Sequence, residues 1–386
     1  MVKTRAPSWL AWSVWGTAAF FYLAGFYLVD SWGARRLLIV GSIVAASGTF
    51  IFGSTSNFFI ASAGRALVGG ATAVGWVVTL KLATHWFPSS RFAMVSGLGL
   101  FMGNMGALVA QVPLRLLVER FGWRAVALVS GAVLLLIAAL TATLVKNDPR
   151  DDGYETYAPE ALRSTDHLSL RTLLKGFRHV FAYRNTWLIF LAQGGFVGSM
   201  IAFTGLWGPP YLRARFGIAS TTAAAVCSVM IVCWAVASPL CGYWSDEIRR
   251  RKPIYLTGAI VASVGWTLMF YVTTLPLAMF VVVSAVTSFA CGAVILGFAY
   301  AKESVPVHFL GTISGATNVG NMIGPMLLQP AIGRVLDARW SGELVNGLRV
   351  YNADAFRAGL LLIVGWSALT AILIAFTRET YCRQAS

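Results

Sequence analysis

Arg65 carries a charge inside an apolar stretch, residues 58–84, that is long enough to cross a lipid bilayer as a helix. Burying an ionisable side chain in a membrane is costly, so such a residue marks a functional site by default. A guanidinium at this depth could hold the carboxylate of a substrate through two parallel hydrogen bonds. The alternative is a structural contact with a backbone carbonyl or a neighbouring helix, and the sequence favours neither.

The residues that share a helical face with Arg65 are small, polar or aromatic. At helical spacing they are Gly69, Thr72, Trp76 and Thr79. Such a face suits the lining of a cavity, so Thr72 and Trp76 are candidates for substrate binding. Lys81 comes sixteen residues after Arg65, which is about 24 Å along a helix and a rotation of about 160°. We therefore expect Lys81 to reach the headgroups, with substrate binding as the alternative.

Polar and aromatic residues in other apolar stretches extend the candidate set for substrate binding. These residues are Tyr22, Gln193 and Asn318. Each has a structural alternative, since tyrosines near span ends anchor helices at the membrane interface and amides can hold glycine-rich helices together. The sequence alone leaves both roles open.

Two charged turns resemble each other, FYLVDSWGARRLL at 26–38 and GYWSDEIRRRKPIYL at 242–256. Each places an aspartate shortly before a basic group, and the charged residues are Asp30 with Arg35 and Arg36, then Asp246 with Arg250 and Arg251. The segments SGLGLFMGNM (96–105) and SGATNVGNMI (314–323) also match, at nearly equal distances from the two turns. The chain therefore contains an internal repeat, which is typical of two similar halves.

The composition of the chain indicates that these residues lie on membrane-spanning helices. Hydrophobic residues make up 57% of the chain and charged residues 12%, against about 25% charged in a soluble domain. Eleven membrane spans are predicted, at 9–29, 37–53, 58–84, 92–113, 125–145, 187–207, 220–243, 254–272, 276–300, 310–333 and 358–377. The polar segment 146–185 separates five spans from six. The predicted domains are an N-terminal bundle (1–145), a linker (146–185) and a C-terminal bundle (186–386).

The basic residues are distributed unevenly between the two predicted sides of the membrane. Counting both chain termini, the side with both charged turns and the linker has 19 Lys and Arg residues, the other side has nine, and Arg65 and Lys81 lie inside helices. Because cytoplasmic loops carry the basic excess, the first side is predicted to be cytoplasmic. The net charge of +15 then needs no nucleic-acid partner, and the scatter of basic residues between spans argues against one. The expected partners are the lipid bilayer and a small-molecule substrate.

The sequence shows no pattern for a metal site or a catalytic site. The five cysteines form no CxxC pair, and the four histidines lack the spacing of metal ligands. Nucleophile-elbow, metalloprotease and phosphate-loop motifs are also missing from the sequence. We therefore expect no cofactor, no metal and no enzymatic activity.

Over essentially its whole length the chain resembles the major facilitator superfamily, whose members have two six-helix halves. The family signature G-x-x-x-D-x-x-G-R-[RK] is matched in part by Asp30, Gly33, Arg35 and Arg36, and again by Gly242, Asp246, Arg250 and Arg251. RALVGGATA resembles a second family pattern, R-x-x-x-G-x-G, with Arg65 at its start. The resemblance implies an all-α polytopic membrane protein of two helical bundles that works by alternating access.

For the charged turns, the resemblance implies a gating role. Asp30, Arg35 and Arg36, with Asp246, Arg250 and Arg251, would form charge pairs that hold one state and break as the halves move. The alternative is simple anchoring by positive charge at the cytoplasmic surface.

The first half is shorter than the family pattern. From Thr186 to Asp246 there are 60 residues, but from Trp9 to Asp30 only 21, a difference close to one helix with its loops. The chain is thus expected to have about 11 transmembrane helices (5 + 6) instead of 12, without the second helix of the family. Three explanations stay open: an in-frame deletion, an incorrectly assigned gene junction, or an eleven-helix variant with its N-terminus outside.

Finer features resemble the branch that contains lysosomal dipeptide transporters and their bacterial relatives. They include KLATHWFPSSRFAMVSGL (81–98), FGWR (121–124) and GLWGPPYL (205–212). The resemblance implies a secondary transporter of short peptides, with organic anions or sugar phosphates as alternative substrates. The alternative function is a non-transporting sensor or a degenerate deletion form. A multi-pass protein of the inner or plasma membrane is expected, as a monomer or a homodimer.

Overall fold

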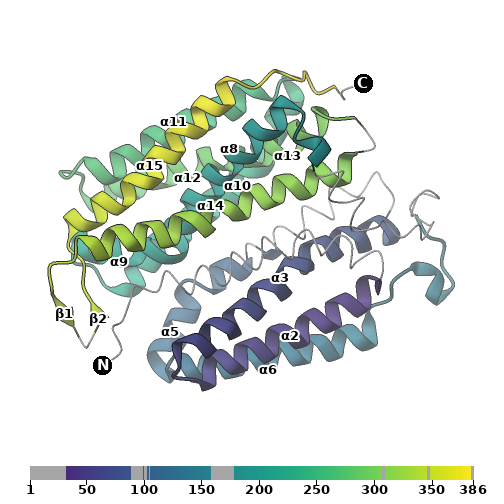
Figure 1. The fold of residues 1–386 in the computed structure, drawn as a ribbon, viewed down its shortest axis with the longest axis horizontal. Helices are drawn as coiled ribbons and strands as arrows, with labels where there is room; N and C mark the ends of the chain where they lie inside the picture. The colour runs from purple at the N-terminus through teal and green to yellow at the C-terminus, as the bar shows by residue number, and fades with distance from the viewer. Residues whose placement is uncertain are drawn as a thin grey trace. The chain divides into compact units, whose positions relative to one another are not determined.

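The computed structural model describes residues 32–87, 99, 102–103, 105–157, 178–306, 309–345 and 348–383, most of them helical (Figure 1). The predicted span 9–29 lies outside these residues, as do Tyr22 and Asp30. The chain forms two compact units. The N-terminal unit draws on Ser13–Gly106 and Leu116–Leu174, and the C-terminal unit on Ala107–Arg115 and Lys175–Ser386.

Three long helices of the N-terminal unit agree with predicted spans. They are α2 (Ala34–Ser54), α3 (Phe58–Trp86) and α6 (Trp123–Leu144), and α2 packs against both others. Asn57 caps α3, because its Oδ1 accepts the N–H groups of Phe59 and Ile60. A Cβ added to Gly48 would lie 2.5 Å from the carbonyl oxygen of Gly64, so α2 and α3 cross through glycine.

The predicted span 92–113 is described only in part, and the structure extends helix beyond its end. Helix α5 runs over Val112–Phe121 and has no buried residue, whereas the prediction stopped at residue 113. The apolar run ends near residue 113, whereas the structure accommodates Pro113 in the first turn of α5, where its missing N–H would be unpaired anyway. Arg115, Glu119 and Arg120 make α5 polar enough to lie outside the predicted apolar run.

Six helical segments of the C-terminal unit match the six predicted spans. They are α8–η3–α9 (Arg184–Ala202, Phe203–Trp207, Gly208–Phe216), α10 (Ser220–Glu247), α11 (Lys252–Tyr271), α12–η4–α13 (Leu277–Cys291, Gly292–Ile295, Leu296–Glu303), α14 (Leu310–Ala338) and α15 (Ala353–Ala375). Two short strands, β1 (Leu344–Val345) and β2 (Leu348–Arg349), form an antiparallel hairpin before α15. Seven helices of the described chain are long and apolar enough to cross a membrane. The all-α, multi-pass fold class is thus confirmed.

Helix α8 widens into a π-helical turn at η3 because of two prolines. The N–H of Gly208 donates to the carbonyl of Phe203, five residues earlier. Pro209 and Pro210 have no N–H to give, so the preceding carbonyls lose their usual partners and the helix changes its repeat. The side chain of Gln329 donates to the carbonyl of Ile201 beside this turn, at 3.3 Å.

Helices α8 and α14 cross at a distance that only glycine permits. A Cβ added to Gly324 would lie 2.1 Å from the carbonyl oxygen of Gly194 and 2.7 Å from the Cα of Gly198. Since these atoms belong to backbone, no side chain can rotate away to make room. Small residues at such crossings let membrane helices pack without a hydrophobic driving force.

We expect Gly324→Val to prevent this crossing and to lower the free energy of unfolding by more than about 3 kcal/mol, at the upper end of overpacking effects. The measurement is the yield of monodisperse protein after extraction into detergent, together with the thermal unfolding midpoint. Gly365→Ala is the control, because a Cβ on Gly365 in α15 meets no atom within 4 Å. Equal behaviour of the two variants would contradict the crossing.

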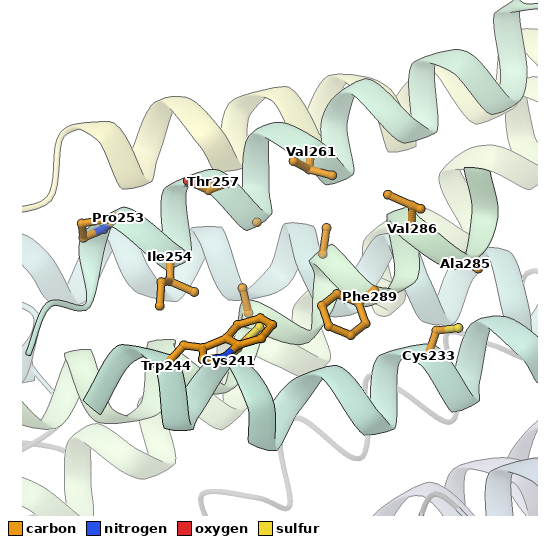
Figure 2. A pocket seen from close by; sticks show the side chains of 13 residues that line it. Cys233, Cys241, Trp244, Pro253, Ile254, Thr257, Val261, Ala285, Val286 and Phe289 are labelled. Atoms are coloured by element: carbon orange, nitrogen blue, oxygen red, sulfur yellow. The ribbon is translucent and has the colours of Figure 1, made fainter. Parts of the chain in front are cut away.

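An apolar groove lies between α10, α11 and α12 and has a volume of about 570 Å³ (Figure 2). Gly258, Ala290 and Ala293 are small residues that line it, and a Cβ on Gly258 would lie 2.5 Å from the Cβ of Ala293. Trp244 and Pro253 line one end, next to the turn that joins α10 to α11.

Candidate functional site

The turn between α10 and α11 directs Arg251 into the C-terminal unit. Ile248 N–H donates to Trp244 O and Arg250 N–H to Ser245 O, which closes the turn tightly. Arg249 has a φ of 51°, in the left-handed region that reverses the chain direction. Arg251 follows as the N-cap of α11 and is only 8% exposed. The basic run RRRK thus contains one buried arginine.

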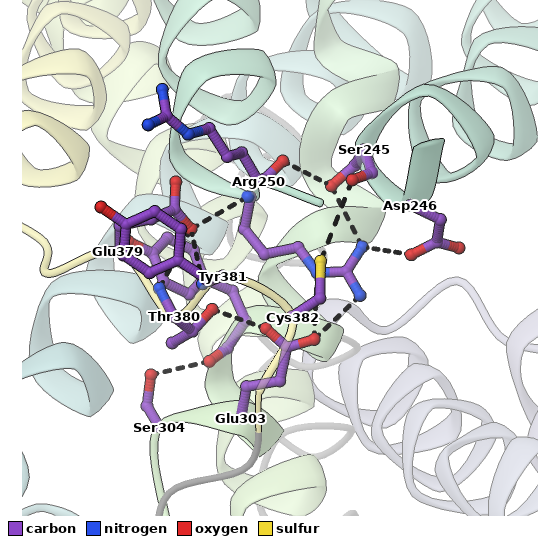
Figure 3. Close-up of polar contacts among 11 residues, drawn as sticks. Ser245, Asp246, Arg250, Glu303, Ser304, Glu379, Thr380, Tyr381 and Cys382 are labelled. Atoms are coloured by element: carbon purple, nitrogen blue, oxygen red, sulfur yellow. Dashed lines mark hydrogen bonds and ion pairs between the residues drawn. The ribbon is translucent and has the colours of Figure 1, made fainter. Parts of the chain in front are cut away.

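Arg251 binds the carboxylates of Asp246 and Glu303, both of which are labelled in Figure 3. Its Nε and Nη2 donate to Oε1 of Glu303, at 3.0 and 2.8 Å, and its Nη1 donates to Oδ1 of Asp246 at 2.6 Å. Nη1 also donates to Oγ of Ser245 at 3.0 Å. Burial alone would lower the pKa of Arg251, but hydrogen bonds to Glu303 and Asp246 raise it above its usual value. The guanidinium therefore stays charged.

The C-terminal segment 377–383 is bound to the same cluster. The carboxylate of Glu379 accepts the backbone N–H groups of Arg251 and Lys252, each at 3.0 Å, at the positive end of α11. Thr380 Oγ1 donates to Oε2 of Glu303 at 2.6 Å (Figure 3). One acidic residue, Glu303, thus links α13 to α11 and to the chain end.

Asn185, near the start of α8, fastens this segment from another side. Its Nδ2 donates to Ser304 Oγ and to the carbonyl of Arg378, both at 2.9 Å, and its Oδ1 accepts the N–H of Arg378 at 3.0 Å. The Tyr300 hydroxyl donates to the same carbonyl at 2.8 Å. The described ends of α8, α10, α11 and α13 therefore meet in one polar network, named here the Arg251 cluster.

We expect Asn185→Ala to release the C-terminal segment, because one side chain supplies both its donor and its acceptor. Hydrogen exchange of the Arg378 amide should become faster by about tenfold or more, corresponding to a loss of about 1–3 kcal/mol of local stability. Asn352→Ala is the control, since Asn352 caps the opposite end of α15. Unchanged exchange over 376–383 in Asn185→Ala would contradict this role.

The structure separates the predicted gating residues of this turn. Asp246 is bonded to Arg251, although its own side chain is 68% exposed. Arg250 lies over the ring of Tyr381, 5.6 Å from its centroid. Glu303 was not among the residues predicted for gating, although its position at the end of a helix indicates that it has a basic partner. A carboxylate as the last residue of a helix is disfavoured by the helix dipole, so it calls for a nearby cation.

The equivalent turn of the N-terminal unit is arranged differently. The backbone N–H of Arg35 donates to Asn147 Oδ1 at 2.8 Å, and its guanidinium donates to the carbonyl of Ala142 at the end of α6. Arg36 is exposed, and Asp30 lies outside the described residues. Within the described chain, Arg35 therefore pairs with backbone and amide groups instead of a carboxylate.

An acidic residue of this end binds a histidine and an arginine. Asp148 Oδ2 lies 3.1 Å from Nδ1 of His85 on α3, and Arg150 Nε donates to Asp148 Oδ1 at 3.1 Å. The Arg150 guanidinium, with His85, holds the pKa of Asp148 well below its usual range. The two units thus use different chemistry at the ends that carry the repeated turns.

Arg65 is half-buried on α3, and its guanidinium lies over the ring of Phe52 from α2, 5.3 Å from the centroid. The structure shows no hydrogen bond or ion pair from Arg65 to another described residue. Phe52 is therefore the contact of the Arg65 guanidinium within the part of the chain that the structure describes.

The other predicted binding residues are in varied surroundings. Thr72 is exposed and donates to the carbonyl of Gly69, Lys81 is half-buried, and the side chain of Trp76 is outside the described part. Gln193 is fully buried on α8, where its Oε1 accepts from Tyr255, 3.4 Å away. Asn318 on α14 is 8% exposed. Their roles in binding stay predictions.

The chain is similar to known membrane transporters along most of its length. The major facilitator superfamily model matches residues 5–211 and 199–381. The lysosomal dipeptide transporter MFSD1 of Danio rerio is 24% identical over 335 residues, 85% of this chain and 72% of that protein. The probable sulfoacetate transporter SauU of Cupriavidus necator is 24% identical over 370 residues, 91% of this chain and 81% of that protein.

A solved D-xylose–proton symporter shares the fold. Its TM-score is 0.73 at 15% identity, covering 98% of this chain and 89% of the symporter. The prediction from the repeated turns is confirmed by the family match, which extends over nearly the whole chain. The chain belongs to the major facilitator superfamily and is a multi-pass membrane transporter, not an enzyme.

Proposed function

We propose that this protein carries small organic solutes with a free carboxylate, short peptides first, by alternating access. The observation that supports this most directly is Arg65, a half-buried arginine held over Phe52 without a described hydrogen-bond partner. A guanidinium in a membrane span that has no acidic partner among the described residues suits an anionic group brought by a substrate.

The named substrates of two relatives have this chemistry in common. A dipeptide has a C-terminal carboxylate, and sulfoacetate has a carboxylate and a sulfonate. Peptides are preferred here because the sequence also resembles the dipeptide branch at 81–98 and 205–212. Small organic anions are the second candidate, supported by the sulfoacetate relative.

For gating, we propose that the Arg251 cluster holds the C-terminal unit in one state of the transport cycle. Arg251, Asp246 and Glu303 come from a turn and two helices, so relative movement of these helices would break their pairs. The repeated residues Asp30, Arg35 and Arg36 are proposed to act likewise in the N-terminal unit. Placement in the inner or plasma membrane is part of the same proposal.

The test is counterflow in liposomes that contain the purified full chain. Liposomes loaded with unlabelled Ala-Lys, acetate, lactate or sulfoacetate would be given the labelled form of each compound outside. Saturable uptake of the dipeptide alone supports the peptide proposal, and uptake of the anions alone supports the second candidate. No uptake of any compound would contradict transport of carboxylates and favour a non-transporting form of the protein.

A further inference from the structure

The groove between α10, α11 and α12 is open towards the surroundings of the helices. Trp244 and Val286 at its rim are 46% and 54% exposed, whereas Ala293 is 1% exposed. All three helical segments belong to candidate membrane spans, so the exposed apolar side chains at this groove are expected to face lipid. The lining is apolar apart from Thr257 and two cysteines. A flexible hydrocarbon chain can fill such a space and regain the dispersion contacts that an empty groove forfeits.

One end of the groove adjoins a concentration of positive charge. Trp244 and Pro253, which line that end, directly flank the turn 245–252, which has four basic and two acidic residues. Arg251 is occupied by the carboxylates of Asp246 and Glu303, and Lys252 Nζ by the carbonyls of α15 and the residues after it.

Arg249 and Arg250 are the exposed remainder of the basic turn. Neither forms an ion pair with a residue that the structure describes, although Arg250 contacts the ring of Tyr381. Arginine binds phosphate oxygens with a fork of N–H donors. The acidic Glu247 beside them is also exposed, and residues 245–252 taken alone have a net charge of +2. The carboxylates of Glu303 and Glu379 bind Arg251 and the start of α11, so Arg249 and Arg250 are the basic groups of the turn that these carboxylates do not contact.

We propose that this groove holds one acyl chain of an anionic phospholipid, whose phosphate group lies against Arg249 and Arg250. The apolar groove and the basic turn would then recognise the two chemically different parts of one molecule. Basic sites at the ends of membrane helices attract anionic headgroups electrostatically, and each arginine or lysine adds to the attraction. This inference concerns a lipid site and does not depend on which solute is carried.

The headgroup is tested by native mass spectrometry of the purified full chain. Phosphatidylglycerol and phosphatidylcholine with the same acyl chains would be added in equal amounts. The first bound lipid should be phosphatidylglycerol by about tenfold or more, because two arginines contribute. R249Q/R250Q should remove most of this preference, while R213Q/R339Q, a pair of exposed arginines at the other end, should retain it. Equal binding of both lipids to the wild type would overturn the proposal.

The acyl chain is tested by filling the groove. Ala285→Phe introduces a ring into the lining and should weaken the first binding step for both lipids, whereas Val264→Phe on the exposed face of α11 should leave it unchanged. A phosphatidylglycerol with a diazirine in its acyl chain should label peptides from α10–α12 of the wild type in preference to α15. This labelling needs no variant, so it decides the matter even if Ala285→Phe fails to fold. Labelling spread evenly over all helices would overturn the proposal. Native mass spectra that show a protein dimer without bound lipid would also overturn it, because a second copy of the chain would then cover the groove.

Discussion

Replacing Arg65 with alanine is expected to reduce kcat/KM for a carboxylate substrate by roughly 30-fold or more, chiefly through KM. The physical reason is that the substrate carboxylate would lose a desolvated, charge-assisted partner, which costs about 2 kcal/mol or more. The side chain is half-buried on α3 over Phe52, so alanine removes the donors without disturbing a described ion pair. The measurement is the initial rate of uptake against substrate concentration in proteoliposomes.

A comparison of substrates separates binding from a structural role. The wild type should prefer a dipeptide over its C-terminal amide, and Arg65→Ala should lose this preference because neither compound then meets the guanidinium. Arg120→Ala, an exposed arginine near the end of α5 in the same unit, is the matched control and should keep it. If Arg65→Ala lowers the rates for acid and amide equally, and lowers the thermal unfolding midpoint as well, then Arg65 supports the packing of α2 and α3.

The helices were predictable because each apolar run ends at local signals. In the C-terminal unit, Pro276 and the basic turn after Glu247 mark helix boundaries within a few residues of the predicted span ends, whereas Gly217 ends α9 nine residues beyond the predicted end at 207. The extent of α5 was missed because Arg115, Glu119 and Arg120 interrupt the apolar run from which the span was predicted. The local sequence pattern therefore predicted the long membrane spans better than the segments that join them.

The partners within the candidate site could not be predicted in this way. Asn185 and Arg378 are 193 positions apart, and Arg251 and Glu303 are 52 apart. No periodicity connects such residues, because their contact arises only when α8, α11 and α13 pack together. The sequence pattern indicated the charged turn and Asp246. The packing of the helices determines that Arg251 is the buried arginine and that Glu303 neutralises it.

The two carboxylates that bind Arg251 are predicted to contribute unequally to the free energy of unfolding. Glu303→Gln is expected to lower the free energy of unfolding by about 2–3 kcal/mol, as expected for a lost bond between charged groups. Asp246→Asn should cost less than about 1 kcal/mol. The reason is exposure: the side chain of Glu303 is 13% exposed and that of Asp246 is 68% exposed, although both bind Arg251. Water screens the second pair far more than the first.

The measurement is thermal unfolding of the purified protein in detergent, followed by tryptophan fluorescence, with both variants and Arg251→Met compared in one detergent. Arg251→Met should be the least stable, since it leaves Glu303 without its cation. Combining it with Glu303→Gln should cost less than the two separate losses added together, because the second change removes the uncompensated charge. If the losses simply add, or if Asp246→Asn is the more damaging change, then the buried pair is not what holds the cluster together. In a transporter that works by moving helices past one another, a pair of this strength is large enough to bias the resting state and small enough to break in each cycle.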